Sequence, residues 1–211
     1  LVKMTVSLPE ISSVSWSGFM TGTDSGNHGI FGFVDLEEGE YKYRFPDFRD
    51  LQVSPFFDEL AKKKMRSVII NLPATYPARE VNGVLISGFV APDLRSAVYP
   101  QKYIPVLEQS GYMIDVEASK GKDKKLEFIS DLHYSLKIRA QVADYLWGKE
   151  KWDLFMLTIT GTDRLHHFLF DAFGNQNHPF HHEFYRYYQA IDNTIGEFYD
   201  RIKERDEYEI V

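Results

Sequence analysis

The residues best suited to chemistry follow an apolar run in the second half of the chain. Asp163 and His167 come just after residues 153–159 and are four residues apart, so one helical turn places both on the same face. A carboxylate oxygen and an imidazole nitrogen suit zinc or manganese. Ligand sites in open α/β sheets gather at the carboxyl ends of strands, where this pair is expected. Two ligands do not close a metal site, and a surface contact is the alternative interpretation.

A run of serines near the start of the chain offers a nucleophile. Ser12, Ser13 and Ser15 lie where a short helix is expected to begin. Free backbone N–H groups at a helix N-terminus favour an alkoxide or a bound phosphate. A hydroxyl still needs a base or a metal to ionise it. From this segment alone, a serine that merely caps the helix is the simpler interpretation.

The other histidines in the second half have weaker spacing. His166 lies one step round the helix and is expected either to support a metal ligand or to pack as a structural side chain. The His-rich stretch 177–183 could bind metal, but Pro179 favours a helix start there. We rank this stretch well below Asp163 and His167.

The elements that must position these residues alternate along the chain. Apolar residues at three- and four-residue steps predict long helices over 126–147 and 180–202. Continuous apolar runs predict buried strands over 67–72 and 153–159, with a short helix over 56–64 before the first. This alternation predicts an α/β fold with a mostly parallel sheet sandwiched by helices.

Shorter patterns predict the remaining elements. Alternating β-branched residues predict strands, and Gly-rich or amphipathic stretches predict turns and short helices. The expected elements are a strand over 1–11, a turn, short helix and turn over 12–29, a loop or hairpin over 30–43, a helix over 101–110, a strand over 112–116 and the start of a strand at 209–211.

The middle of the chain, residues 73–125, has the pattern of a segment inserted into the fold. Residues 73–92 form a long connection punctuated by Pro and Gly, with its own apolar stretch at 84–90. Loops of that length are usually functional or inserted. We therefore expect an insertion, cap or small subdomain over 73–125 within a single α/β domain over 1–211. That domain is expected to be incomplete at both ends.

Composition bounds the partners. The 211 residues contain 24 basic and 31 acidic side chains, a net charge of -7, and no basic patch, so nucleic acid is not an expected partner. The Lys-rich stretch 120–125 is expected to be a solvated loop. No apolar run is long enough to span a membrane, and the absence of cysteine suits a cytoplasmic location. The sequence predicts no oligomeric state.

Together these segments resemble the type I phosphodiesterase and nucleotide pyrophosphatase branch of the alkaline phosphatase superfamily, and more closely its microbial predicted phosphohydrolases and phosphomutases. The matching segments occur in family order and cover most of the chain. They are residues 9–16 (PEISSVSW), 21–30 (TGTDSGNHGI), 71–77 (NLPATYP), 82–88 (NGVLISG), 152–155 (WDLF), 163–167 (DRLHH) and 191–192 (ID).

The resemblance assigns roles to particular residues. A Ser or Thr four residues before the Trp position is the family nucleophile and a metal ligand, and counting back from Trp16 gives Ser12. Asp163 and His167 match the ligands of one of two divalent ions, zinc or manganese. The remaining family ligands have no match here, so these 211 residues are expected to bind metal weakly and to turn over slowly.

Two further positions match the family motif in different ways. His28 stands at a signature histidine and is expected to serve loop structure. Ser15 stands where nucleotide pyrophosphatases usually carry an Asn that contacts a phosphoryl oxygen, which argues against nucleotide diesters. Both residues, with His166, are expected to lie behind the groups that touch the substrate.

The function implied is metal-dependent hydrolysis of a small-molecule phosphate mono- or diester through a phosphoserine at Ser12. Ser12, Asp163 and His167 are accordingly expected to converge at the carboxyl edge of the sheet. A phosphomutase of the same superfamily is the nearest alternative. A non-catalytic α/β binding module is an alternative from a different class, and sulfate esters stay open as substrates.

Overall fold

The computed structural model describes residues 5–203, which form two compact units. Within that range, the first unit comprises 5–110 and Ala143–Thr158, and the second comprises Gly111–Val142 and 159–203. Helix α6 (Lys125–Lys149) contributes residues to both units. The expectation of a single domain that is incomplete relative to its family stays a prediction.

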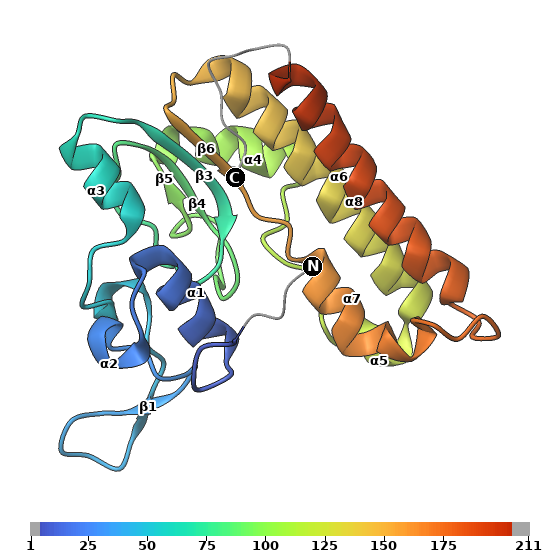
Figure 1. The fold of residues 1–211 in the computed structure, drawn as a ribbon, viewed down its shortest axis with the longest axis horizontal. Coiled ribbons are helices and arrows are strands. Elements are labelled where there is room, and N and C mark those ends of the chain that lie inside the picture. Colours follow the sequence, from blue (N-terminus) through green and yellow to red (C-terminus); the bar gives the residue numbers. More distant parts are fainter. Residues whose placement is uncertain (1–4, 204–211) are drawn as a thin grey trace. The chain divides into compact units, whose positions relative to one another are not determined.

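A four-stranded sheet forms the centre of the first unit (Figure 1). Its order is β5-β4-β3-β6, and both neighbours of β3 run parallel to it, whereas β5 is antiparallel at one edge. All six residues of β3 are buried, as its unbroken apolar sequence predicts for a central strand. The strands are β3 (Ser67–Leu72), β4 (Gly83–Ser87), β5 (Val98–Tyr99) and β6 (Leu154–Leu157).

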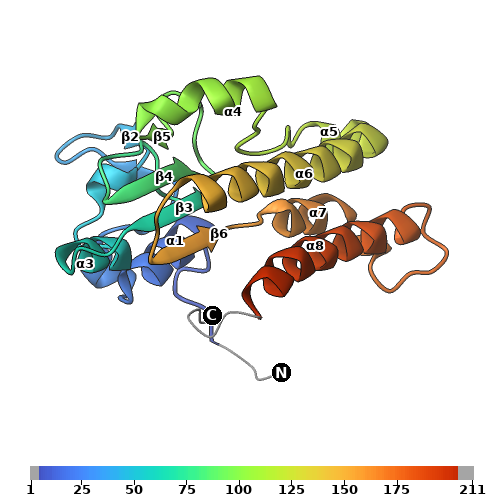
Figure 2. The same ribbon diagram turned by 90° about the horizontal axis from the view of Figure 1, so that it is seen from above.

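Helices flank both faces of this sheet. Figure 2 shows α1 (Ser12–Thr21) and α3 (Phe56–Lys62) on one side and α4 (Ile104–Ser110) on the other. Because side chains alternate along a strand, Ile69 faces the side opposite to Val68. Ile69 belongs to a buried cluster that joins α1, α3 and the sheet, with Met20, Phe48, Phe57, Leu72 and Leu85. The predicted α/β fold with a mostly parallel sheet is confirmed.

Short elements follow α1 and fill out the first unit. A helical turn and then a two-stranded antiparallel hairpin appear where turns and a hairpin were expected. The amide of Glu40 donates to the carbonyl of Glu37 at 3.0 Å and closes the hairpin turn. These elements are α2 (Ser25–His28), β1 (Asp35–Leu36), β2 (Tyr43–Arg44), and the 3-10 helices η1 (Phe48–Asp50) and η2 (Gln101–Tyr103).

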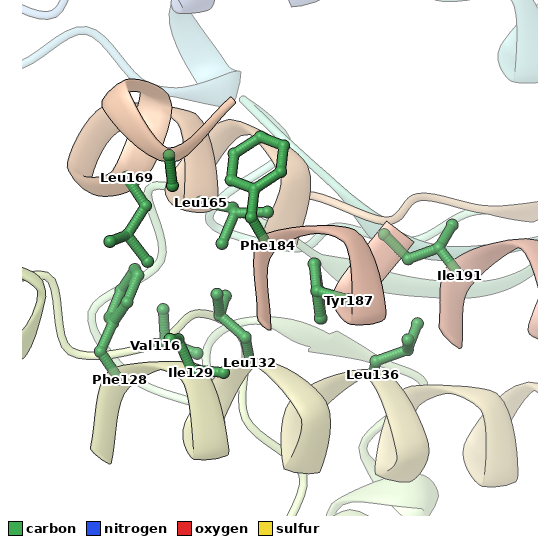
Figure 3. Close-up of a cluster of buried hydrophobic side chains, with 11 residues drawn as sticks. Val116, Phe128, Ile129, Leu132, Leu136, Leu165, Leu169, Phe184, Tyr187 and Ile191 are labelled. Carbon is green, nitrogen blue, oxygen red and sulfur yellow. The ribbon is translucent and has the colours of Figure 1, made fainter. Parts of the chain in front are cut away.

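The second unit is built from helices. Its buried cluster joins α6, α7 and α8, and Figure 3 shows Leu169 and Tyr187 directed toward the α6 side chains. Helices α6 and α8 confirm the two long helices predicted from apolar spacing. The elements are α5 (Lys120–Asp123), α6, α7 (Gly161–Leu169), η3 (Phe170–Ala172) and α8 (His181–Ile202).

Four local predictions are wrong. Residues 5–11 form no strand, while residues 1–4 and the expected strand at 209–211 lie outside the described range. Residues 112–116 also form no strand, because the carbonyls of Met113 and Ile114 accept hydrogen bonds from Arg139 instead of from a neighbouring strand. The Lys-rich stretch begins with the helical turn α5 rather than a loop, and Lys120 pairs with Asp131 at 2.7 Å.

The fourth correction concerns the long connection over 73–92. Its apolar stretch includes β4, a fully paired strand of the main sheet in which Val84, Leu85 and Ile86 are completely buried. The pairing with β3 satisfies the backbone and explains why three consecutive apolar residues occur there. The range 73–125, expected as an insertion or cap, thus contains β4 and β5 of the sheet.

A close contact at the start of α7 gives a stability prediction. A Cβ built on Gly161 would lie 1.8 Å from the hydroxyl oxygen of the buried Tyr187. Gly161→Ala is therefore expected to destabilise the protein by about 1–3 kcal/mol through overpacking, measured by urea unfolding. Gly196→Ala, on α8 with no atom within 4 Å of its Cβ, is the matched control and should stabilise slightly. Equal unfolding midpoints for the two variants would contradict this view of the α7–α8 contact.

Candidate active site

Ser12 is the first residue of α1 and its side chain is exposed. The preceding residue, Ile11, has an extended backbone and makes no side-chain hydrogen bond to the helix. No serine therefore caps α1 in the way considered from the sequence. The amide groups of the first turn point along the helix axis beside the Ser12 hydroxyl, where they favour negative charge.

A pocket places Ser12 beside the sheet edge. Ser12 and Ser13 line it together with Pro73 and Ala74, which follow β3, and Phe89, which follows β4. Its volume is about 50 Å³. Because β3 and β4 are parallel, these segments mark the carboxyl edge of the sheet, where ligands bind in open α/β folds.

Side-chain hydrogen bonds fix the two loops of this edge. The hydroxyl of Thr75 donates to the carbonyl of Leu72 at 2.6 Å, and the hydroxyl of Ser87 donates to the carbonyl of Thr75 at 2.8 Å. Thr75 and Ser87 are fully buried, so both bonds are shielded from water. The loops that follow β3 and β4 are thereby tied together behind the pocket.

Asp163 and His167 lie on one face of α7. The imidazole Nε2 of His167 is 3.6 Å from the carboxylate Oδ1 of Asp163, and both side chains are more than half exposed. The chain reaches α7 from the carboxyl end of β6, where the amide of Thr158 donates to the carbonyl of Ile70. One carboxylate oxygen and one imidazole nitrogen are thus available together at the surface of the second unit.

His166 has a different surrounding from its neighbour. Its Nε2 is 2.6 Å from the Tyr188 hydroxyl, and its ring stacks on Phe184 with centroids 5.6 Å apart. Burial raises the pKa of the Tyr188 phenol, which therefore keeps its proton. The His166 imidazole thus contacts two aromatic side chains of α8, and whether it also supports a metal ligand stays a prediction.

An ion pair that the sequence did not reveal holds α7 from another side. The guanidinium of Arg164 makes a forked contact with the Asp115 carboxylate, with Nε 2.9 Å from Oδ2. The two side chains are only 13% and 20% exposed, so the pair is shielded from solvent. Nothing in the spacing of residues 115 and 164 signals this contact. It fixes the helix that carries Asp163 and His167.

His28 is fully buried beneath the loop that follows α2. Its Nδ1 accepts a hydrogen bond from the amide of Ile30 at 3.1 Å. Burial lowers the pKa of His28, so the ring is neutral at physiological pH. These contacts fit the structural role expected for it. Ser15 is half-buried on α1 and does not line the pocket.

The His-rich stretch makes structural contacts. His181 Nδ1 lies 2.9 Å from the carbonyl oxygen of Ala172, and His178 Nε2 lies 3.3 Å from the carboxylate of Asp171. His182 is exposed beside Glu183. The first two contacts join the start of α8 and the residues just before it to η3, and α8 begins at His181, two residues after Pro179.

The donor set can be compared with that of a metal centre. Within residues 5–203, no group of three or more His, Asp or Glu side chains could hold a metal ion. The Asp163–His167 pair fits two positions of a zinc or manganese site, by donor type and by their shared helical face. Ser12 belongs to the first unit and the pair to the second, so their convergence stays a prediction.

Comparison with known families agrees with the α/β fold. A family model, "Type I phosphodiesterase / nucleotide pyrophosphatase", matches residues 1–211. The chain therefore belongs to this family of hydrolases within the alkaline phosphatase superfamily. No curated protein and no solved structure matches the chain significantly.

The family acts on small-molecule phosphate esters. Between residues 5 and 203, no helix is long and apolar enough to cross a membrane.

Proposed function

We propose that the protein hydrolyses phosphate mono- or diesters with Ser12 as the nucleophile, through a phosphoserine intermediate and with two divalent ions, zinc or manganese. The observation that carries the proposal is the position of Ser12. Ser12 is the first residue of α1, its hydroxyl is exposed, and no side chain caps this helix. The residue lies at the carboxyl edge of a parallel sheet, in a chain of the phosphodiesterase family.

The reaction divides into two displacements at phosphorus. In the first, the Ser12 hydroxyl gives up its proton to solvent and its oxygen forms a bond to phosphorus, the bond to the leaving alcohol breaks, and the alcohol oxygen takes up a proton from solvent. In the second, a water molecule gives up a proton to solvent as its oxygen bonds to phosphorus, the bond between phosphorus and the Ser12 oxygen breaks, and that oxygen takes up a proton from solvent. The amide groups at the start of α1 face the charge that develops on the phosphoryl oxygens.

Asp163 and His167 would hold one of the ions, with Ser12 as a further ligand. When bound, divalent ions lower the pKa of a coordinated hydroxyl and offset the phosphoryl charge. The Arg164–Asp115 ion pair and the His166–Tyr188 contact set the rotation of α7 about its axis. They keep Asp163 and His167 directed away from the buried core of the second unit.

The proposal is tested by trapping the intermediate. The protein is incubated with zinc or manganese and a radiolabelled phosphate ester, quenched in acid and mapped by mass spectrometry. We expect one phosphoryl group on Ser12 and release of inorganic phosphate or a monoester. Phosphate on another residue would move the nucleophile. No labelling and no turnover with either ion would favour the non-catalytic binding module.

The same experiment separates hydrolase from mutase. With a sugar or glycerate acceptor present, a hydrolase still passes the phosphoryl group to water. Transfer to the acceptor hydroxyl in preference to water would identify a phosphomutase, and the Ser12 intermediate would be common to both.

A further inference from the structure

We propose that the pocket beside Ser12 binds the organic group of the ester, and that this group is uncharged, mainly apolar, about four to six heavy atoms in size and carries one hydrogen-bonding atom that meets Ser13. The proposal deepens the function proposed above and rests on it for the phosphate to which the group is attached. It names a substrate class that the family match does not give.

The first feature that indicates an apolar group is the lining of the pocket. Most of the pocket wall is apolar and comes from segments of the first unit that are far apart in sequence. The apolar lining residues are Trp16, Ile30, Phe33, Pro46, Phe48, Leu51, Pro73, Ala74, Phe89 and Val90. Phe33 and Val90 remain partly exposed, so the pocket opens to solvent. An apolar group gains by leaving water for such a wall.

The volume of the pocket limits the size of the group that it can bind. A volume of about 50 Å³ has room for roughly four water-sized groups. A nucleobase with its ribose is much larger and needs several hydrogen-bond partners in the wall. A short branched chain or a small ring fits the space and leaves few polar atoms unpaired.

The charge of the pocket lining limits the charge of the group that it can bind. Among the residues that the structure describes, Asp47 is the only charged one in the pocket lining, and no Lys, Arg or His belongs to that lining. Burial opposes ionisation of Asp47, but hydrogen bonds from Arg49 lower its pKa, so the carboxylate stays negative. A second phosphate or a carboxylate on the substrate would meet this carboxylate, whose cationic partner Arg49 is already engaged by it. The wall therefore disfavours phosphorylated sugar acids and nucleoside polyphosphates.

The hydroxyl of Ser13 is available to hydrogen-bond to a bound group. Ser13 lines the pocket, and its buried Oγ has no hydrogen-bond partner among the described residues. Tyr76 also lines the pocket, but its hydroxyl donates to Asp93 at 2.6 Å. A hydroxyl can donate or accept, so Ser13 can meet an alcohol, ether or carbonyl oxygen of the bound group.

The test uses Trp16, which lines the pocket and reports binding without metal or turnover. Cyclopentanol, glycerate and adenosine are titrated while Trp fluorescence is recorded. We expect a saturable change with cyclopentanol that disappears in Trp16→Phe, and no comparable change with the other two. Ser13→Ala should weaken cyclopentanol about fivefold, the effect of one hydrogen bond. Ser15→Ala, on the same helix but outside the lining, should leave the affinity unchanged.

Several results would overturn the proposal. Glycerate or adenosine binding as tightly as cyclopentanol would refute the charge and size arguments. An unchanged cyclopentanol affinity in Ser13→Ala, with native circular dichroism, would refute the role of that hydroxyl. A fluorescence change that persists in Trp16→Phe would place the ligand elsewhere.

Failure of this proposal and failure of the proposed function are separable. If Ser12 is phosphorylated but cyclopentanol does not bind, the hydrolase assignment stands and the pocket assignment is wrong. If cyclopentanol binds as described but no phosphoserine forms, the pocket is a binding site and the catalytic assignment is wrong. If both hold, cyclopentyl phosphate should be cleaved with a higher kcat/KM than phosphoglycerate, and Ser13→Ala should reduce that preference.

Discussion

Ser12→Ala is expected to abolish phosphoenzyme formation and to lower turnover by on the order of 10³-fold or more, because it deletes the atom that attacks phosphorus. Metal content should stay nearly unchanged, since the Asp163–His167 pair remains. Stability should also change little, because the Ser12 side chain is exposed and caps nothing. Acid-quench labelling and metal analysis of the purified variant measure the first two effects.

The neighbouring serines are the matched controls for this substitution. Ser13→Ala should retain the phosphoenzyme and change only the choice of substrate, and Ser15→Ala should have a modest effect on rate. If Ser12→Ala kept its rate while Ser13→Ala or Ser15→Ala lost it, the register counted back from Trp16 would be wrong. The family assignment would stand, and the nucleophile would move along α1.

His167→Ala should lower metal affinity at least as much as the roughly 10–100-fold cost of losing a group behind a ligand. Activity should fall at low metal concentration and recover in part when zinc or manganese is added. The imidazole is more than half exposed and lies outside the α7–α8 core, so the unfolding midpoint should hardly move. Metal titrations of activity, with equilibrium binding by calorimetry, separate affinity from stability.

His166→Ala is the matched comparison one helical step away. Its ring contacts Phe184 and Tyr188, so its removal should reduce stability by about 1 kcal/mol and affect metal affinity less than His167→Ala. An equal loss of metal affinity in both variants would show that the two histidines share the ion. A loss confined to His166→Ala would reverse the assignment within α7.

Much of the fold follows from periodicity. Residues 125–149 and 181–202 repeat apolar side chains at helical spacing over many turns, and β3 and β6 are unbroken apolar runs, so each element is determined by its own sequence. The strand β4 was not assigned to the sheet because Pro and Gly surround it. Its membership depends on pairing with β3, a contact between distant segments.

The strand predicted over 112–116 is absent for a related reason. Their alternation suits a strand, but the carbonyls there bond to Arg139 of a helix that follows later in the chain. A local pattern cannot reveal which distant group satisfies a backbone carbonyl.

The candidate site was predictable where motifs are contiguous. Ser12, Asp163 and His167 stand in short segments whose residue types and spacing led to their assignment, and their roles stay predictions. The pocket beside Ser12 could not be predicted, because its wall is assembled from the start of α1, the hairpin region and the loops after β3 and β4. Asp115 likewise becomes a partner of Arg164 only when the second unit folds.

The division of these groups between two units bears on how such a protein can diverge. Among residues 5–203, no side chain is shared between the buried cluster behind the Ser12 pocket and the cluster that carries α7. Substitutions in separate clusters without common partners have nearly additive effects. Drift in the pocket wall can therefore change which organic group is accepted while the packing beneath Asp163 and His167 is inherited intact. Under the proposed function, substrate range would depend on one cluster and metal preference on the other.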